Sequence, residues 1–301
     1  IDRNCSRLEQ GTAMENIAKN VSPGLLRNSL LFPLALILAL ALPAAKAGSE
    51  SRYNDWELWS SSANAVLPAR RGQPGPFRIN AALGAVAAPE FLGSDTIAMK
   101  PLPLLDVNYK GRLFLSTQQG IGWNAWRKRT LRAGPRITFD FGRLAADAPS
   151  LAGLPDINIG TEAGLFLESF VAAWRFKGDI RKEIGGGHAG LLLNGEAAWG
   201  NRWTKNTSLI LGLRATYMDD TYAESYFSVA AANATGNRRA YAAAGGFRDV
   251  NAYVQIIYDF NQAFYVATEF RATMLMQQAA DSPITETDAF VAGSLMLGYR
   301  F

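Results

Sequence analysis

The sequence predicts an all-β fold: a transmembrane, antiparallel, up-and-down β-barrel of about twelve strands, with ten strands as the alternative. Three observations lead to this fold class. Segments of about ten residues alternate between apolar and polar side chains, and turn signals separate them. Mean hydropathy is only -0.02 although 49% of the 301 residues are hydrophobic, so the apolar residues are dispersed rather than collected in helical spans. The chain also ends on a strand whose apolar face runs to the last residue.

The first 47 residues are interpreted as an upstream extension followed by a cleaved secretory signal peptide. An apolar run from Leu30 to Ala45 follows the basic residues Lys19 and Arg27 and ends in small residues. This order of basic, apolar and small residues is typical of a signal peptide, and it predicts cleavage after Ala47. An uncleaved anchor is the alternative, but the run is short for a membrane span. Met14 is a second candidate start.

Cysteine content and charge exclude several function classes. Cys5, the single cysteine, leaves with the leader, which excludes disulfides, thiolate metal sites, a cysteine nucleophile and a lipoprotein anchor. The leader holds five of the 30 Lys and Arg and three of the 26 Asp and Glu, so the mature chain is almost balanced in charge. Such a balance does not indicate a nucleic-acid partner.

Residues 48–76 are rich in Ser, Pro, Gly and Arg, and Pro68–Pro76 cannot hold a helix or an inner strand. This composition predicts a flexible N-terminal tail, in which Trp56 and Trp59 are candidates for docking on a partner. The predicted barrel domain then spans residues 77–301.

Alternation with a period of two begins at Phe77 and continues to the C-terminus. In the first segment, for example, Ile79 and Leu83 share one face while Arg78 and Asn80 share the other. Ser225–Ala230 is a candidate for a twelfth strand, because bacterial single-chain barrels favour an even number. The eleven clearer segments are 77–85, 102–109, 112–122, 131–141, 157–167, 170–176, 191–199, 209–217, 254–260, 264–274 and 290–301.

The orientation of these faces separates a membrane barrel from a soluble one. A soluble lipocalin-like barrel would turn its apolar face inward, whereas segments of this length suit tilted membrane strands. In hydrocarbon every backbone polar group needs a partner, so such strands must close into a barrel. Aromatic residues near the segment ends predict an interfacial girdle, formed by Tyr109, Trp123, Trp126, Trp199, Trp203, Tyr217, Tyr222, Tyr258 and Tyr299.

The polar faces carry charges of both signs, which are predicted to point into the lumen. Mixed charges at close range would pair across the interior, so we expect a narrow or plugged lumen rather than a wide pore. The candidate lumen residues are Arg78, Arg132, Arg136, Glu162, Glu168, Glu196, Arg214, Glu269 and Arg271.

The last twelve residues resemble the assembly signal of bacterial outer-membrane barrels. Val291, Leu295 and Leu297 share the apolar face with Tyr299 and Phe301, and the final residue is aromatic. We therefore predict that the barrel assembly machinery recognises Tyr299 and Phe301. Lipids and lipopolysaccharide of the outer membrane would surround such a protein.

No constellation of residues predicts catalysis, a cofactor or a metal. His188 is the only histidine and lies in a glycine-rich turn, without a Ser-x-Gly elbow or metal-ligand spacing around it. Asn206–Ser208 is too weak a motif to support a phospholipase. Gly185–Gly187 lacks the Gly-Lys-Ser/Thr of a phosphate loop, so it is interpreted as a turn that needs a positive φ.

Several short motifs, in order along one chain, resemble the MltA-interacting protein (MipA/OmpV) family. The resemblance covers about residues 77–301. The motifs are Gly84–Asp95, Pro101–Pro103, Arg112–Leu115, Ala133–Pro135, Phe141–Arg143, Leu151–Ile157, Gly187–His188, Tyr226–Val229 and Gly245–Val250.

This resemblance implies a non-enzymatic barrel in the outer membrane of a Gram-negative cell envelope. The family's named member is a scaffold that links a lytic transglycosylase to a penicillin-binding protein during peptidoglycan (murein) synthesis and remodelling. The alternatives are a small-solute outer-membrane channel and a surface antigen. The family supplies no catalytic motif that could be transferred to this chain.

Overall fold

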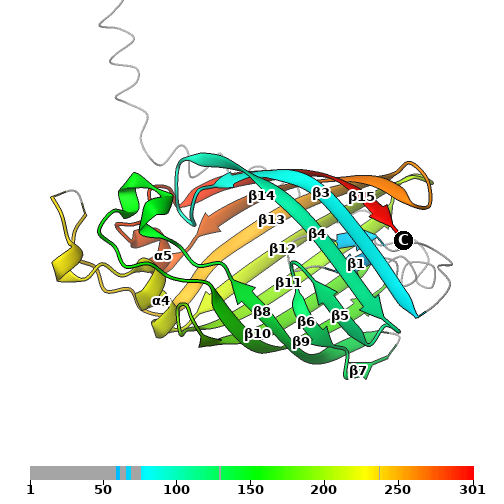
Figure 1. The fold of residues 1–301 in the computed structure, drawn as a ribbon, viewed down its shortest axis with the longest axis horizontal. Helices are drawn as coiled ribbons and strands as arrows, with labels where there is room; N and C mark the ends of the chain where they lie inside the picture. The colour runs from blue at the N-terminus through cyan, green and yellow to red at the C-terminus, as the bar shows by residue number, and fades with distance from the viewer. Residues whose placement is uncertain (1–58, 62–65, 69–75, 129, 237) are drawn as a thin grey trace, which may run out of the picture.

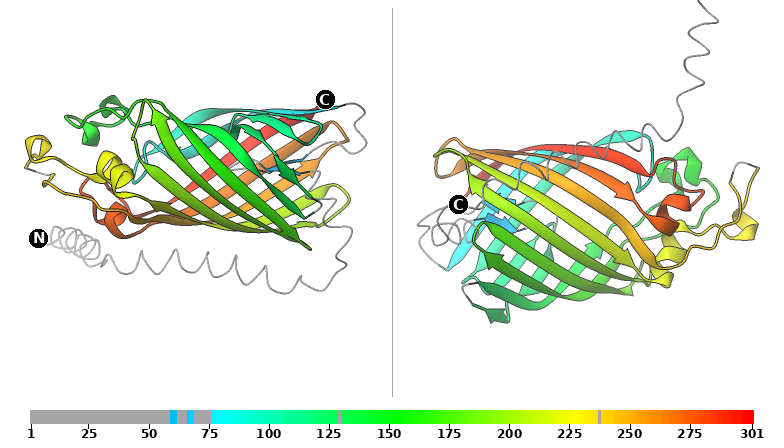
Figure 2. Two further views of the ribbon diagram at one scale, coloured as in Figure 1. Left: turned by 90° about the horizontal axis from the view of Figure 1, so that it is seen from below. Right: turned by 180° about the vertical axis from the view of Figure 1, so that it is seen from behind.

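A closed antiparallel β-barrel of twelve strands forms the body of the protein (Figures 1 and 2). The computed structural model describes residues 59–61, 66–68, 76–128, 130–236 and 238–301. The barrel strands are β3 (Phe77–Pro89), β4 (Ile97–Tyr109), β5 (Leu113–Ser116), β6 (Gly120–Trp123) with β7 (Trp126–Arg127), β8 (Leu131–Asp140), β9 (Gly160–Val171), β10 (Trp174–Gly185), β11 (Leu191–Arg202), β12 (Thr207–Met218), β13 (Gly246–Asp259), β14 (Phe264–Leu275) and β15 (Ala289–Arg300).

The barrel closes by pairing its last strand with its first. β15 runs antiparallel to β3, with Leu297 opposite Leu83 and Arg300 opposite Asn80. Every other neighbour in the sheet is adjacent in the chain, as expected for an up-and-down barrel. β6 and β7 both pair with β8 and together serve as one interrupted strand.

The predicted number of strands is confirmed, but the twelfth strand is not the one expected. Ser225–Ala230 lies in and after α4 (Asp220–Phe227), not in a strand of the barrel. The Asp219 side chain accepts a hydrogen bond from the Tyr222 N–H at 2.8 Å and so caps this helix. The extra strand comes from residues 112–122, which fold into the β5–β6 hairpin because Gly120 turns the chain with φ +76°.

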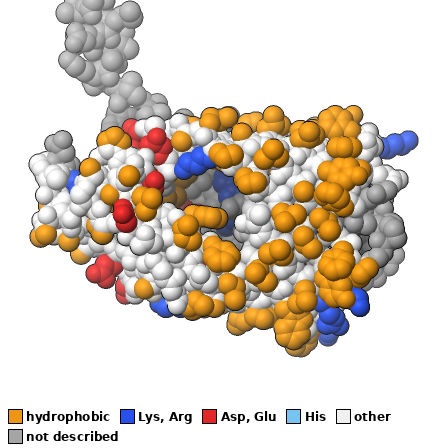
Figure 3. Space-filling model, in the orientation of Figure 1, with side chains coloured by type: hydrophobic (Ala, Val, Ile, Leu, Met, Phe, Trp, Pro, Cys, Tyr) orange, Lys and Arg blue, Asp and Glu red, His pale blue; other side chains and the backbone are white. Residues whose placement is uncertain are grey.

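Side chains alternate between the outer surface and the lumen along each strand, in the expected phase. On β15, Val291, Leu295 and Leu297 are exposed, whereas Met296 and Arg300 are buried. Figure 3 shows the resulting surface, on which hydrophobic side chains cover the barrel wall and charged ones gather towards its ends. An apolar exterior around a polar interior is the arrangement that a lipid bilayer requires.

The two ends of the barrel differ in the length of their connections. The end that holds the C-terminus has short turns, such as 172–173, 203–206 and 260–263. The other end has long connections, which contain α4, α5 (Gln277–Asp281) and the short helices η2 (Ala145–Asp147), η3 (Pro149–Leu151) and η4 (Ala231–Asn233). Because outer-membrane barrels have short periplasmic turns and long extracellular loops, the C-terminal end is periplasmic.

The wall is incomplete on the extracellular half of β4. Its partner β5 pairs only with Asp106–Tyr109, and β6 reaches β8 only at Ile137 and Arg136. Within the described chain, no strand therefore pairs with this edge of β4 from residue 97 to residue 104. Figure 3 shows a hollow in the barrel wall, in the region where Figure 1 draws β4 and β8 apart. This hollow is called the wall opening below.

Residues 48–76 were expected to form a flexible tail, and the structure describes only two short strands within them. β1 (Trp59–Ser61) and β2 (Val66–Pro68) form a separate two-stranded sheet, which Figure 1 draws within the outline of the barrel near its periplasmic end. The predicted signal peptide, its cleavage after Ala47, and Trp56 lie outside the described residues. No helix among the described residues is long and apolar enough to cross a membrane.

Candidate functional site

A charged network crosses the lumen and centres on Glu196 of β11. The Glu196 carboxylate accepts hydrogen bonds from the guanidinium groups of Arg175 and Arg214, on the strands to either side. The Tyr253 hydroxyl donates a further bond to the same carboxylate at 3.2 Å. Glu196 and Arg175 are almost fully buried. One carboxylate therefore links four strands, β10 to β13.

A second network is centred on β10 and connects this strand to β9 and β8. Arg136 Nη2 lies 2.8 Å from Asp179 Oδ1, and Arg181 Nη1 lies 2.6 Å from Glu162 Oε2. Lys177 Nζ lies 3.7 Å from Glu168 Oε1. Glu162 and Glu168 lie on β9, which pairs with β10, and Arg136 reaches Asp179 across β9 from β8. Strand order and register, rather than sequence distance, therefore bring these groups together.

Apolar and aromatic side chains form a buried cluster in the lumen on its periplasmic side. Tyr253 and Tyr265 lie at the centre of this cluster, which we call the periplasmic plug. The Tyr265 hydroxyl donates to Asn80 at 2.6 Å, and its ring lies 4.4 Å from the Arg300 guanidinium. The plug consists of Ala82, Leu104, Phe170, Ala198, Ile210, Tyr253, Ile257, Tyr265, Ala267 and Met296, contributed by eight strands.

Glycine makes room for this plug. A Cβ atom on Gly298 would lie 2.0 Å from the Tyr265 ring, and one on Gly212 would lie 2.3 Å from the Tyr253 ring. Both tyrosine rings therefore lie against the bare backbone of a neighbouring strand. The plug depends on glycine at these two positions as much as on its large residues.

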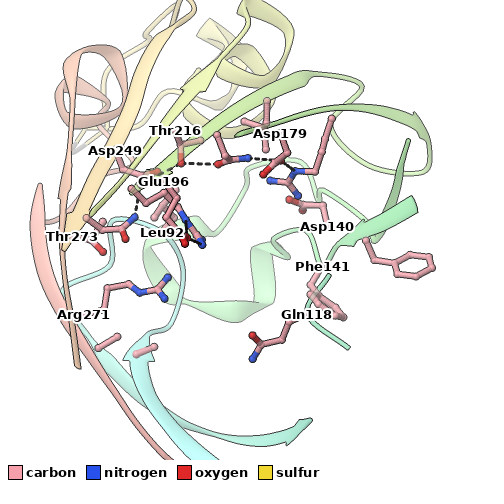
Figure 4. Close-up of a pocket in the computed structure, with 18 of the residues that line it drawn as sticks. Leu92, Gln118, Asp140, Phe141, Asp179, Glu196, Thr216, Asp249, Arg271 and Thr273 are labelled. Carbon is pink, nitrogen blue, oxygen red and sulfur yellow. Dashed lines mark hydrogen bonds and ion pairs between the residues drawn. The ribbon is translucent and has the colours of Figure 1, made fainter. Parts of the chain in front are cut away.

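A cavity of about 840 Å³ lies above the plug and is continuous with the wall opening. Figure 4 shows Gln118, Asp140 and Phe141 on one side of it, and Glu196 and Arg271 on the other. Six basic residues line this cavity, against four acidic ones. They are Arg136, Lys177, Arg181, Arg214, Arg248 and Arg271, with Asp140, Asp179, Glu196 and Asp249.

The extracellular connections pack into a cap that is fastened to the wall through His188. The His188 ring contacts Tyr222 of α4 with centroids 4.6 Å apart, and its carbonyl oxygen accepts the Ser225 hydroxyl at 2.9 Å. On the wall side, His188 Nε2 lies 3.5 Å from Glu162 Oε1. His188 was expected to be an ordinary loop residue. It does lie in a loop, but it is buried and joins α4 to β9.

Two tyrosines of α4 hold the cap against the barrel through further hydrogen bonds. Tyr226 donates to Asp140, and Tyr222 accepts a hydrogen bond of 2.7 Å from Arg248. Burial raises the pKa of Tyr222 to about 12, against the opposing effect of Arg248. Burial also raises the pKa of Tyr226, and Tyr222 and Asp140 add to that effect. Both phenols therefore stay protonated and able to donate at physiological pH.

Residues 81–301 match the sequence profile of the family described as MltA-interacting protein MipA. The chain belongs to the MltA-interacting protein family. The family and the closed barrel place it in the Gram-negative outer membrane. No curated protein matches this MipA-family chain.

Solved outer-membrane barrels are similar in fold to this MipA-family chain at low sequence identity. An outer-membrane channel from Pseudomonas putida F1 is 9% identical, with a TM-score of 0.42, over 76% of this chain and 97% of its own. The outer-membrane channel DcaP of Acinetobacter baumannii is 14% identical, with a TM-score of 0.35, over 73% of this chain and 72% of its own.

The nine candidate lumen residues of the MipA-family barrel all lie on strand faces opposite the apolar exterior. Arg136, Glu162, Glu168, Glu196 and Arg214 belong to the two networks above. The other four have their own contacts: Arg271 with Glu269 at 2.6 Å, Arg132 over the Phe170 ring at 4.9 Å, and Arg78 with Asn108 at 3.5 Å.

Five polar residues of β10 and β11 were not among the predicted lumen residues, although the same alternation places them on the inner face. They are Arg175, Lys177, Asp179 and Arg181 of β10 and their neighbour Asn194 of β11. Tyr222 was wrongly assigned to the aromatic girdle, because it belongs to α4 and is buried under the cap. Trp199 was also expected there, and it is covered by Leu211 and Ala173.

Tyr299 and Phe301 lie at the periplasmic end of the barrel. Their rings contact each other with centroids 4.8 Å apart, and Phe301 N–H donates to the Ile79 carbonyl oxygen at 3.0 Å. The last residue is therefore held to β3. Their reading as an assembly signal stays a prediction.

Asp140, Glu162 and His188 bring potential metal-ligand atoms within 4.8 Å of one another. His188 Nδ1 accepts the Gly190 N–H at 2.9 Å, so the network assigns the proton of a neutral imidazole to Nε2. A metal ion would need a free lone pair on Nε2, the nitrogen that faces Glu162. The arrangement thus suits a histidine–carboxylate contact better than a metal centre.

Proposed function

We propose that this chain is a non-catalytic scaffold of the outer membrane that holds a lytic transglycosylase, and through it a penicillin-binding protein, at the periplasmic face. The family description, MltA-interacting protein, supports the first partner. The second partner follows only from the resemblance of the sequence to the family. In this function the barrel is an anchor for enzymes that remodel peptidoglycan, and it needs no pore and no reactive group.

The periplasmic plug is the observation that carries this proposal. Eight strands contribute buried side chains to it, and Tyr253 and Tyr265 are tied by hydrogen bonds to Glu196 and Asn80. A channel for small solutes needs a continuous aqueous path, and packed apolar side chains with satisfied hydroxyls oppose one. The plug therefore favours an anchor over a solute channel, which remains the second candidate because of the cavity above the plug.

Conductance and binding measurements on one preparation test the proposal. The mature protein would be refolded into planar bilayers, alongside a variant with Tyr253→Ala and Tyr265→Ala as a matched opened form. We expect silence from the wild type and steady openings from the double variant. Steady openings from the wild type at a similar conductance would show that the plug does not close the lumen.

The partner is tested separately by titrating a soluble lytic transglycosylase of the MltA class onto the barrel in nanodiscs. Lys205, in the periplasmic β11–β12 turn, is exposed, as is Glu224 on the extracellular α4. We expect saturable binding that a Lys205→Glu change weakens and a Glu224→Lys change leaves intact. No binding by a folded barrel, or equal sensitivity to both changes, would contradict a periplasmic scaffold.

A further inference from the structure

The wall opening has one edge that cannot be closed by pairing. Leu105 N–H and C=O both point towards the β5–β6 hairpin, where they contact Thr117 Oγ1 at 3.2 Å and Thr117 N at 3.0 Å. Because these groups alternate with a period of two, positions 103 and 101 point their backbone the same way. Both positions are proline, which has no N–H. The chain thus lacks two donors that another strand would require.

Unpaired backbone in the hydrocarbon zone is tolerated only where it lines a cavity. Here the edge of β4 borders the cavity, since Pro101, Pro103 and Gln118 line it together with Phe139 and Phe141 of the opposite rim. The opening therefore connects the bilayer to a chamber inside the barrel. It lies on the extracellular half of the wall, which faces the outer leaflet.

The rim and the depth of this opening differ in chemistry. Met99 of β4 and Phe141 next to β8 are 72% and 77% exposed, so the rim presents apolar side chains to lipid. Deeper in, Arg136 and Lys177 are buried and line the same cavity. Figure 3 shows basic side chains at the depth of the hollow and hydrophobic ones around it.

Two of the buried basic side chains have N–H donors that form no hydrogen bond to a described residue. Arg136 gives one nitrogen to Asp179, but its Nε and Nη1 form no hydrogen bond to a described residue. Lys177 Nζ also forms none, since Glu168 lies at the longer ion-pair distance of 3.7 Å. Buried donors without partners are costly, and a group with several acceptor oxygens would satisfy them.

We propose that the wall opening binds an anionic, phosphate-bearing lipid of the outer leaflet, with the phosphate against Arg136 and Lys177 and the acyl chains in the bilayer along the apolar rim. The cavity volume of about 840 Å³ is within the range of small-ligand sites and suits a headgroup better than a whole lipid. Charge complementarity and the apolar rim together select an amphiphile. This site is independent of the scaffold function proposed above.

Lipid retention by the purified barrel tests the proposal. Wild type and an Arg136→Gln/Lys177→Gln variant would be placed in nanodiscs containing lipid A, phosphatidylglycerol and phosphatidylcholine, transferred to detergent and analysed by native mass spectrometry. Losing charged hydrogen bonds should reduce lipid A retention about tenfold to a hundredfold. Arg78→Gln, an inward arginine that does not line the cavity, is the matched control and should retain wild-type lipid.

A second variant keeps the test valid if the charge changes disturb folding. Gln118→Trp places a large ring at the mouth without altering a charge, and it should reduce lipid A retention while the barrel stays heat-modifiable on gels. Equal retention of phosphatidylcholine, preference for phosphatidylglycerol over lipid A, or displacement of lipid A by millimolar inorganic phosphate would each overturn the assignment. Unchanged retention in both folded variants would also overturn it.

Discussion

Removal of the Glu196 carboxylate should be the most damaging single change in the lumen. Glu196→Ala leaves Arg175 and Arg214 without the anion that separates them, and their side chains are only 1% and 12% exposed. Breaking one buried ion pair by removing a partner costs about 3–5 kcal/mol. Since two guanidinium groups lose the same partner here, we expect a loss of about 5 kcal/mol.

Two further variants separate charge from packing. Glu196→Gln keeps the shape and one acceptor, so the expected loss is about 2 kcal/mol, the value of a hydrogen bond to a charged group. Adding Arg175→Ala to Glu196→Ala removes one of the two cations that pair with Glu196 in the wild type. The double variant should therefore be more stable than the sum of the single effects by at least ~1 kcal/mol.

The assay is reversible urea unfolding in phospholipid vesicles, followed by tryptophan fluorescence. Glu224→Ala removes an exposed carboxylate on α4 and is the control, with an expected effect under about 0.5 kcal/mol. A loss below about 1 kcal/mol for Glu196→Ala would refute the reasoning, as would strict additivity with Arg175→Ala. Either result would mean that water enters the network and screens it.

Three other predictions address the cap and the plug. His188→Ala should release α4 from the wall, so that protease cuts the 219–245 loop faster while the barrel remains folded. Burial opposes ionisation of the Glu286 carboxyl, but hydrogen bonds from Ser94, Ser150 and the Asp95 N–H hold its pKa below the usual value of 4.5. The ionised Glu286 carboxylate therefore stabilises the loops that it joins above about pH 4.5, and this stabilisation is lost as the pH falls through the lower folded pKa. Hydrogen exchange of the loop amides should show this pH dependence, and Glu286→Gln should abolish it. Gly298→Ala should destabilise the barrel by about 1–3 kcal/mol through the Tyr265 ring, whereas Gly293→Ala, with no atom closer than 3.5 Å, should be tolerated in the same urea assay.

The inward and outward faces could be predicted from the sequence because a strand has only two faces. The period of two is local, so Glu196 and Arg214 could be placed in the lumen without knowing the register. Their pairing could not be predicted, because it depends on which residues face each other across strands. The contact between Glu162 and His188 is of the same kind, since it needs both the register and the path of a loop.

The misassigned twelfth strand has a local cause. Tyr226–Val229 has a short apolar pattern that fits a strand or a helix equally, and length alone does not separate them. The N-cap at Asp219 is a sequence signal for a helix, and weighing it would have favoured α4. The turn within 112–122 has no Asn-Gly or Pro-Gly signature, so the sequence predicts one strand where the structure has the β5–β6 hairpin.

Because β15 pairs with β3, the barrel can close only after its last strand is available. Gly293 and Ala87 face each other although about 200 residues separate them, and loop closure over such a span is slow. Until the final strand arrives, β3 and β14 each carry an open edge beside an apolar face, and such edges promote aggregation. A chain that stops before residue 289 would therefore be a poorly soluble sheet with two free edges, not a smaller barrel.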